Sequence, residues 1–179
     1  MDKYRKGFIE RGKLEFNFNI EKEVIEYKVA SGERLFKDDQ KYIDDYNQKC
    51  QDTNGEKLQL IEEYGVWKNN FIEKYMEYPQ EKLDAFLFHL RHGAKVQKRI
   101  KEVTITLVTP VIVGVVLCYF ENFFINDMES YLYSISLIGF MILFFVYFML
   151  GMKLVEKYNV KQEAYEKYAE FIEEIIKKE

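Results

Sequence analysis

Two long apolar stretches dominate the pattern of hydrophobic and polar positions in this chain. Residues 103–120 and 131–152 contain no charged side chain, whereas charged residues are frequent before the first stretch and after the second. As helices they reach about 27 and about 33 Å, and the hydrocarbon core of a bilayer is about 30 Å thick. The short segment 121–130 between them therefore predicts a helical hairpin that crosses a membrane twice. The charge distribution disfavours the alternative of two core helices in a soluble protein.

The positions before this hairpin predict a mostly helical region. Residues 14–20 alternate apolar and polar side chains, which favours a short strand, although helical spacing fits the segment nearly as well. Apolar residues then recur at helical intervals over 35–50, 58–75 and 83–100. Pro79 is expected to end the second of these helices and to start the third. We therefore predict a mainly all-α fold with a possible strand near 14–20.

After the hairpin, the pattern predicts an amphipathic helix over 153–179. Its apolar positions follow a spacing of three and four residues that Lys161 interrupts at one position, with Glu and Lys between them. They are Tyr158, Tyr165, Tyr168, Ile172 and Ile175. The spacing is that of a coiled coil, but the helix is short for an independent one. It packs either against 83–100 of the same subunit, which we expect, or against neighbouring subunits.

These patterns divide the chain into four predicted parts. They are a cytosolic, mostly helical region (1–90), a basic juxtamembrane segment (91–102), a transmembrane helical hairpin (103–152) and a cytosolic amphipathic helix (153–179). Within the hairpin, 103–120 and 131–152 are the spans and 121–130 is the outer loop. The prediction is thus an integral membrane protein with soluble extensions.

The distribution of charge gives the hairpin an orientation. The chain carries 26 Lys and Arg, 30 Asp and Glu, and a net charge of −4. Basic residues gather before the first span, at Arg91, Lys95, Lys98, Arg99 and Lys101, and the outer loop has none. By the positive-inside rule both termini then face the cytoplasm, as in a multi-pass protein of a bacterial inner (plasma) membrane. No apolar run follows the first residues, so no cleavable signal is expected.

The same basic cluster predicts a partner. Such clusters attract anionic lipid head groups, at about 1 kcal/mol per charge near the surface. We therefore expect membrane lipids to bind at the cluster. No long basic stripe or aromatic RNA signature accompanies it, so nucleic acid is not an expected partner.

Small side chains define one face of the first predicted span. Thr106, Pro110, Gly114 and Cys118 recur every four residues, a spacing that lets helices approach closely in lipid. The face serves either a homo-oligomer or a pore, or it packs against the second span of the same hairpin. Pro110 is expected to kink the helix and to free a carbonyl that Thr106 or Thr109 then serves.

Few residues of the chain are candidates for ion binding, metal binding or catalysis. The loop acids Glu121, Asp127 and Glu129 form a ring at a cation pore if the hairpin oligomerises, and otherwise a solvated loop. His89 and His92 are spaced like two ligands on one helix, but no third ligand accompanies them, so no metal or cofactor is expected. No P-loop, nucleophile elbow or metalloprotease motif is present, so no enzymatic activity is expected.

The layout of residues 80–179, a tight two-span hairpin with flanking cytosolic helices, resembles the SLATT-type two-transmembrane effector domains of bacterial defence systems. The resemblance implies an effector that oligomerises on a cytosolic cue and makes the membrane leaky. Our leading hypothesis is an oligomeric membrane effector or pore-forming protein controlled by its cytosolic helices. The alternatives are a membrane-anchored adaptor or immunity protein that binds a soluble partner through 1–90, and a small cation channel with an acidic outer loop.

Overall fold

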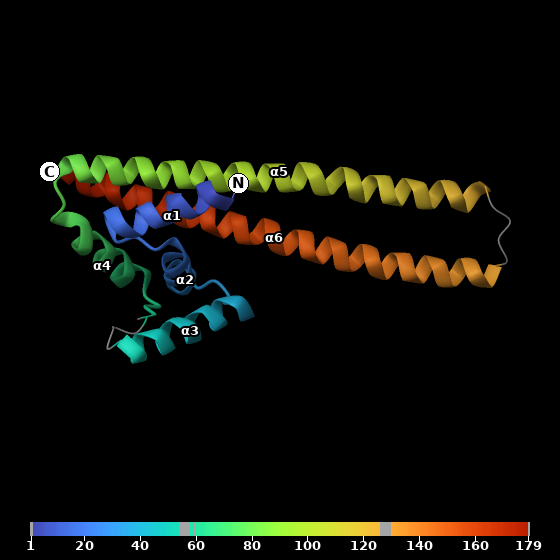
Figure 1. Cartoon of the computed structure of the whole chain (residues 1–179), viewed down its shortest axis with the longest axis horizontal. Coiled ribbons are helices and arrows are strands. Elements are labelled where there is room, and N and C mark those ends of the chain that lie inside the picture. Colours follow the sequence, from blue (N-terminus) through green and yellow to red (C-terminus); the bar gives the residue numbers. More distant parts are fainter. Residues whose placement is uncertain (1, 54–57, 59, 126–129, 179) are drawn as a thin grey trace. The chain divides into compact units, whose positions relative to one another are not determined.

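The computed structural model describes residues 2–53, 58, 60–125 and 130–178, with the side chains at 2–6, 52–53, 108, 111–112, 115–125, 130–137, 140 and 143 left out. This part of the chain is helical and contains no strand, which confirms the prediction of a mainly all-α fold. Its helices are α1 (Asp2–Phe16), α2 (Ile20–Ala30), α3 (Lys37–Thr53), α4 (Tyr64–Met76), α5 (Gln80–Ile125) and α6 (Ser130–Lys178) (Figure 1).

The strand predicted near 14–20 is wrong, because the chain passes there from α1 to α2. Asn17 has a positive φ of 51°, and the side chain of Asn19 caps α2 by accepting a hydrogen bond from the Glu21 N–H. Phe16 and Phe18 are both buried. The alternation of apolar residues thus reflects a tight helix–helix connection that turns both rings inward, not the pleat of a sheet.

The other predicted helix boundaries agree in part with the structure. Helix α4 begins at Tyr64, so Leu58 and Ile61 precede it and do not extend its apolar face. The carbonyl of Pro79 accepts hydrogen bonds from the N–H groups of Lys82 and Leu83. Pro79 therefore separates α4 from α5, as expected of a proline at a helix start.

The chain divides into two compact units, and each of the two long helices contributes to both. Unit 1 contains Met1–Ala94 and Val160–Glu179, and unit 2 contains Lys95–Asn159. Helices α1 to α4 thus belong to unit 1, together with the first part of α5 and the last part of α6.

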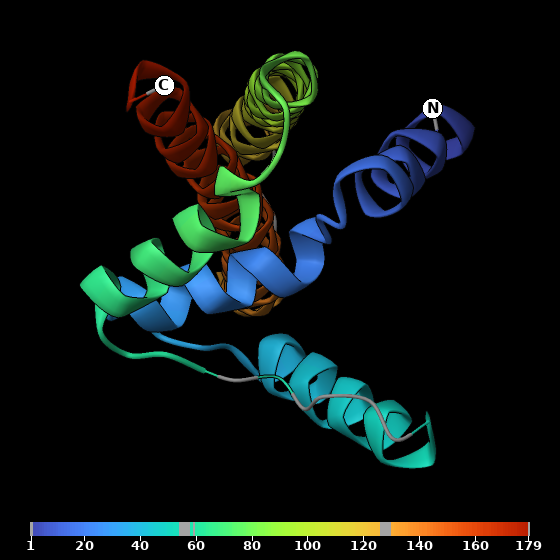
Figure 2. The same ribbon diagram turned by 90° about the vertical axis from the view of Figure 1, so that its left-hand side faces the viewer.

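Aromatic side chains form the core of unit 1. Trp67 and Phe71 of α4 contact Tyr168 and Phe171 of α6, with ring centroids 4.5 to 5.8 Å apart. Figure 2 shows α4 beside α2, and Tyr27 of α2 also contacts Trp67. Such aromatic pairs contribute about 0.5–1.5 kcal/mol each beyond the area they bury. This packing joins α2 and α4 to the C-terminal part of α6.

The apolar face of the C-terminal amphipathic helix packs into the core of unit 1. Tyr165, Tyr168, Ile172 and Ile175 are all buried. A Cβ atom at Gly93 of α5 would lie 2.6 Å from Cε1 of Tyr165, so glycine makes room for this ring. The structure thus packs the predicted helix against the 83–100 region of its own chain.

Unit 2 consists of the two antiparallel parts of α5 and α6 (Figure 1). Lys101 Nζ of α5 donates a hydrogen bond to Asn159 Oδ1 of α6 at 2.9 Å. Beyond this bond, large apolar side chains are exposed on both helices. They include Val103, Ile105, Leu107 and Val113 on α5, and Ile138, Met141, Ile142, Phe145, Val146, Phe148, Leu150 and Leu154 on α6.

Among the residues that the structure describes, no helix offers an apolar stretch of the length needed to cross a membrane. The side chains at 108, 111–112, 115–137, 140 and 143 lie outside this description. Many residues of the predicted spans 103–120 and 131–152 are among them.

Candidate functional site

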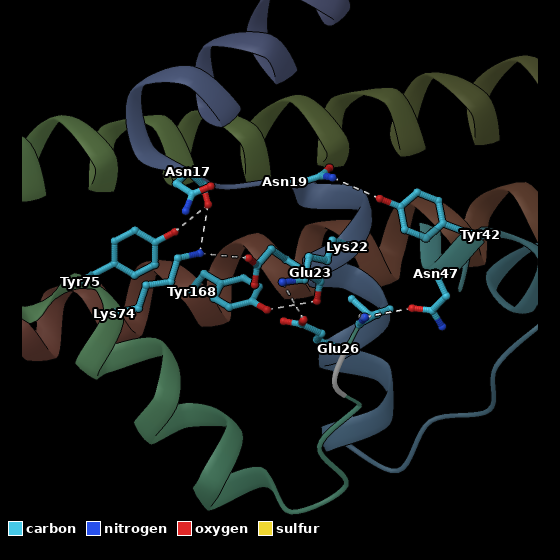
Figure 3. A network of polar contacts seen from close by, with 11 residues as sticks. Asn17, Asn19, Lys22, Glu23, Glu26, Tyr42, Asn47, Lys74, Tyr75 and Tyr168 are labelled. Atoms are coloured by element: carbon cyan, nitrogen blue, oxygen red, sulfur yellow. Dashed lines mark hydrogen bonds and ion pairs between the residues drawn. The ribbon is translucent and has the colours of Figure 1, made fainter. Parts of the chain in front are cut away.

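A buried carboxyl group lies at the centre of unit 1. Glu23 of α2 is only 4% exposed, and its Oε1 lies 3.9 Å from Nζ of Lys74 on α4 (Figure 3). Burial raises the pKa of Glu23 to about 7, the negative charge of Glu26 adds to the rise, and Lys74 opposes it. Near neutral pH this carboxyl group therefore exists in both its protonated and its ionised form.

Lys74 also binds the connection between α1 and α2. Its Nζ donates to the backbone carbonyl of Asn17 at 3.0 Å, and Tyr75 Oη donates to the same oxygen at 3.4 Å. Figure 3 shows both side chains reaching from α4 to Asn17. One carbonyl in a left-handed backbone conformation is thus held by two adjacent residues of another helix.

A third helix joins this arrangement through Tyr168. Its hydroxyl donates to the backbone carbonyl of Glu23 at 3.1 Å. Burial raises the pKa of Tyr168, and the nearby Glu23 adds to the rise. On α2 itself, Lys22 pairs with Glu26 at 3.3 Å. We call Lys22, Glu23, Glu26, Lys74 and Tyr168 the Glu23 cluster; Glu23 and Tyr168 are buried, Lys22 and Glu26 are half-buried, and Lys74 is exposed.

Further polar contacts attach α3 to this part of unit 1. Asn19 Nδ2 donates to Tyr42 Oη at 3.1 Å, as Figure 3 shows. The buried Lys28 pairs with Asp39 at 2.7 Å. These contacts join α3 to α2 and to the α1–α2 connection. Lys74 of α4 contacts the same connection and α2.

The sequence analysis missed the Glu23 cluster. Glu23 lies among other charged residues in α2, where a solvated position is the usual interpretation. One signal was present, because Glu23 follows Ile20 by three residues and precedes Tyr27 by four, which places it on the apolar face of α2.

The two histidines lie against aromatic side chains. Phe8 stacks on His89 with centroids 4.0 Å apart, and Phe16 contacts the same ring. Burial, with smaller contributions from Arg11 and His92, lowers the pKa of His89 to about 4. No group of three potential ligands occurs among the described residues. His89 serves as a neutral packing residue between α1 and α5.

The predicted lipid-binding residues have different partners in the structure. Arg91 pairs with Glu173 of α6 in unit 1 at 2.8 Å, and Lys101 binds Asn159 in unit 2. Lys95, Lys98 and Arg99 are exposed. These three side chains therefore point to solvent at the start of unit 2.

The small-residue face of α5 is described for Thr106, Pro110 and Gly114. A Cβ atom at Gly114 would meet no atom within 4 Å, so no other part of the described chain packs on this glycine. Pro110 lies inside the continuous helix α5. The side chain of Cys118 lies outside the described residues.

The threonines beside Pro110 do not serve the carbonyl that it frees. Proline removes the N–H that would bind the Thr106 carbonyl. Thr106 Oγ1 donates instead to the Glu102 carbonyl, and Thr109 Oγ1 donates to the Ile105 carbonyl, both at 2.8 Å. That expectation was wrong because each hydroxyl reaches the carbonyl four residues before its own position.

The acidic loop lies outside the described residues. This holds for the placement of Asp127 and Glu129 and for the side chain of Glu121. The acidic ring therefore stays a prediction.

Comparison with known proteins gives one match. The model of the sodium bile acid symporter family matches residues 85–158, which is less than half of the chain. Neither a curated protein nor a solved structure shows significant similarity to the chain. Members of the matched family are transporters and not enzymes, in agreement with the expected lack of enzymatic activity.

Proposed function

We propose that this chain is an oligomeric membrane protein that makes the bacterial inner membrane permeable to small solutes under the control of unit 1. The proposal rests on the exposed apolar side chains of α5 (Val103 to Val113) and α6 (Ile138 to Leu154), which we call the apolar band. Soluble monomers rarely expose apolar patches larger than a few hundred Å². The match to a family of membrane transporters supports the same compartment.

The ends of the band agree with a membrane boundary. On α5 the exposed residues change from Lys98 and Arg99 to Val103 and Ile105. On α6 they change from Leu150 and Met152 to Lys153, Glu156 and Lys157, with Leu154 among the charged residues. Positive charge beside an apolar helix favours the cytoplasmic side. We therefore propose that α5 and α6 cross the membrane twice with both termini in the cytoplasm.

The hydroxyl groups within the band also suit an apolar environment. Thr104, Thr106 and Thr109 each donate to a carbonyl of their own helix at 2.8 Å. A polar group without a partner is costly in hydrocarbon, and these bonds supply the partner without a second helix.

The open space beside Gly114 supports an oligomer. Among the described residues no atom lies within 4 Å of a Cβ at this position, and such space allows the close approach of another helix, which is how small residues promote association in lipid. The same layout of two spans and cytosolic helices underlies the resemblance to SLATT-type effectors. The predicted spans contain no Asp, Glu, Lys, Arg or His, so we propose a pore and not an ion-coupled transporter.

The test is induced expression in bacteria with a membrane-potential dye. We expect depolarisation with the wild type and its loss with Gly114→Leu, which fills the space needed for helix association. Val113→Leu is the matched control, because it changes an adjacent exposed side chain of α5 and should leave depolarisation intact. Healthy cells with an unchanged membrane potential, or equal behaviour of the two variants, contradict the proposal.

A second candidate is a membrane-anchored adaptor or immunity protein. Leu14 and Phe88 of unit 1 are 85% and 73% exposed, and exposed large apolar residues are frequent at protein interfaces. Because α6 completes the core of unit 1, the full chain and not the fragment 1–90 is the correct bait. A specific partner should bind the wild type and not Leu14→Lys or Phe88→Lys, and equal recovery with all three argues against this role.

A further inference from the structure

Lys74 is shared between two oxygen atoms that differ in charge. Its Nζ lies 3.0 Å from the Asn17 carbonyl and 3.9 Å from Oε1 of Glu23. The first distance is a hydrogen bond, and the second is long for an ion pair. The arrangement therefore suits a neutral Glu23, because a buried carboxylate demands a close positive partner.

We propose that Glu23 and Lys74 form a proton-sensitive clamp on the connection between α1 and α2. When Glu23 carries its proton, Lys74 holds the Asn17 carbonyl. When the proton leaves for solvent, the carboxylate draws Lys74 toward itself, and the connection loosens. Tyr75 still binds Asn17 in the loosened state, but at 3.4 Å its bond is the longer of the two.

Of the charged groups around Glu23, Lys74 is the positive group that can pair with an ionised Glu23. The titratable side chains that face it are Lys22 and Glu26 on α2, Lys74 and Tyr75 on α4, and Tyr168 on α6. Lys22 already pairs with Glu26 at 3.3 Å. The Tyr168 hydroxyl donates to the backbone carbonyl of Glu23, and its hydrogen bonding to the Glu23 carboxyl lowers the pKa of that group, but Tyr168 carries no positive charge. Among these described neighbours, the response to ionisation therefore falls on Lys74.

The direction of the pH response follows from the raised pKa of Glu23. This pKa is about 7 in the packed unit, against an ordinary value of 4.5. The packed state thus loses stability as the pH rises from 4.5 to about 7, and the loss levels off above that. We consider a local opening of unit 1 that exposes the Glu23 carboxyl to water. The equilibrium constant of this opening should increase about tenfold between pH 6 and pH 8.

His89 responds in the opposite direction, so the test must separate the two groups. The pKa of His89 is lowered to about 4. The stability that depends on its neutral form is complete above its ordinary pKa of 6.5 and is lost as the pH falls through 4. A variant that removes only the Glu23 charge keeps the His89 response and provides the reference.

The experiment is hydrogen exchange on the purified full chain in detergent, with labelling times scaled to the intrinsic exchange rate at each pH. The reporter is the Phe18 N–H, which donates to the Gly12 carbonyl at 3.0 Å across the connection. We expect the opening constant of the wild type, divided by that of Glu23→Gln, to increase about tenfold from pH 6 to pH 8. Glu21→Gln, an exposed carboxyl on the same helix, should follow the wild type.

Lys74→Met supplies a second, independent readout. It removes the positive charge nearest Glu23, so the wild-type pH curve should shift to higher pH while exchange at Phe18 becomes faster at every pH. The clamp is contradicted if the ratio of the wild-type opening constant to that of Glu23→Gln stays constant with pH. It is also contradicted if Lys74→Met does not shift the pH dependence of exchange at Phe18. If Glu23→Gln does not fold, the Lys74→Met shift still decides.

The clamp is a property of unit 1 alone. Only its use as a control on membrane permeability rests on the proposed function. Because exchange at Phe18 is measured without any flux, failure of the clamp and failure of the pore give different results.

Discussion

At the scale of single residues, close packing around Gly93 is the most sensitive contact in unit 1. The Tyr165 ring occupies the space where a Cβ atom at this position would lie, at 2.6 to 2.8 Å from three ring carbons. Tyr165 is itself buried, so its ring has little room to move away. Tight contacts of this kind make even one added methyl group destabilising.

We predict that Gly93→Ala destabilises unit 1 by about 1–3 kcal/mol, because overpacking forces the ring or the helix to shift. Thermal unfolding of the full chain is followed by tryptophan fluorescence, since Trp67 is the single tryptophan and lies in the core of unit 1. Gly7→Ala is the control. No atom lies within 4 Å of a Cβ there, so this helical position should be unchanged or stabilised. Equal stability of both variants would contradict the packing argument.

The sequence predicted apolar residues of the core better than polar ones. Tyr168 and Ile172 follow from spacing alone, since hydrophobic periodicity places them on one helix face. The spacing of α2 also places Glu23 on its apolar face, but it does not identify the residues that Glu23 and His89 contact. Lys74 and Phe8 come from other helices, and no local pattern on α2 or α5 identifies them.

At the scale of elements, α3 depends on a few contacts with α2. Lys28 is buried, and its Nζ pairs with Asp39 at 2.7 Å while it lies over the ring of Phe36. Asp39 also accepts a hydrogen bond from the Phe36 N–H at 2.9 Å. One carboxylate thus both starts α3 and neutralises a buried ammonium group.

Asp39→Asn should loosen α3 and leave the rest of unit 1 folded. Loss of the carboxylate leaves the buried Lys28 without its charged partner, at a cost of about 1–3 kcal/mol. We expect faster limited proteolysis within 37–53 and an unchanged Trp67 emission. Asp38→Asn alters the neighbouring exposed carboxylate and should be cleaved like the wild type. Uniform cleavage of the whole chain in Asp39→Asn would instead indicate that α3 is not a separable element.

Helix existence was easier to predict than helix limits. Pro79 marks the start of α5 through its fixed backbone, which the sequence states directly. Leu58 and Ile61 continue the apolar spacing of α4 without being helical, so periodicity alone extended that helix too far. Near 14–20, the alternation of Phe16 and Phe18 matched a strand because a tight connection between helices also turns alternate residues inward.

At the scale of the whole molecule, the two units differ in whether their large apolar side chains are buried or exposed. Unit 1 buries its aromatic residues in its own core. Unit 2 leaves apolar residues exposed on both helices, including Leu107 at 66% and Phe145 at 62%. The apolar stretches and the packing of the C-terminal helix against the 83–100 region were expected from the sequence, whereas the contacts of that helix with α2 and α4 required the structure.

The proposed orientation predicts the side of the membrane on which Cys50 lies. In a Cys118→Ser background, an impermeant maleimide should label Cys50 only after the cells are permeabilised, because unit 1 is then cytoplasmic. Asn126→Cys in a chain that also lacks Cys50 is the control, and it should react in intact cells. Labelling of Cys50 from outside contradicts the orientation, and failure of the control contradicts the hairpin.

The positive φ of Asn17 has a consequence for how this sequence can vary. Left-handed backbone is readily adopted by glycine, asparagine and aspartate, and is strained for β-branched residues. The bonds from Lys74 and Tyr75 reach the carbonyl at this position and not its side chain. Natural variants should therefore exchange Asn17 freely for Gly or Asp while keeping the two donors on α4, and a Val or Ile at position 17 should appear only where α1 has been lost or rebuilt.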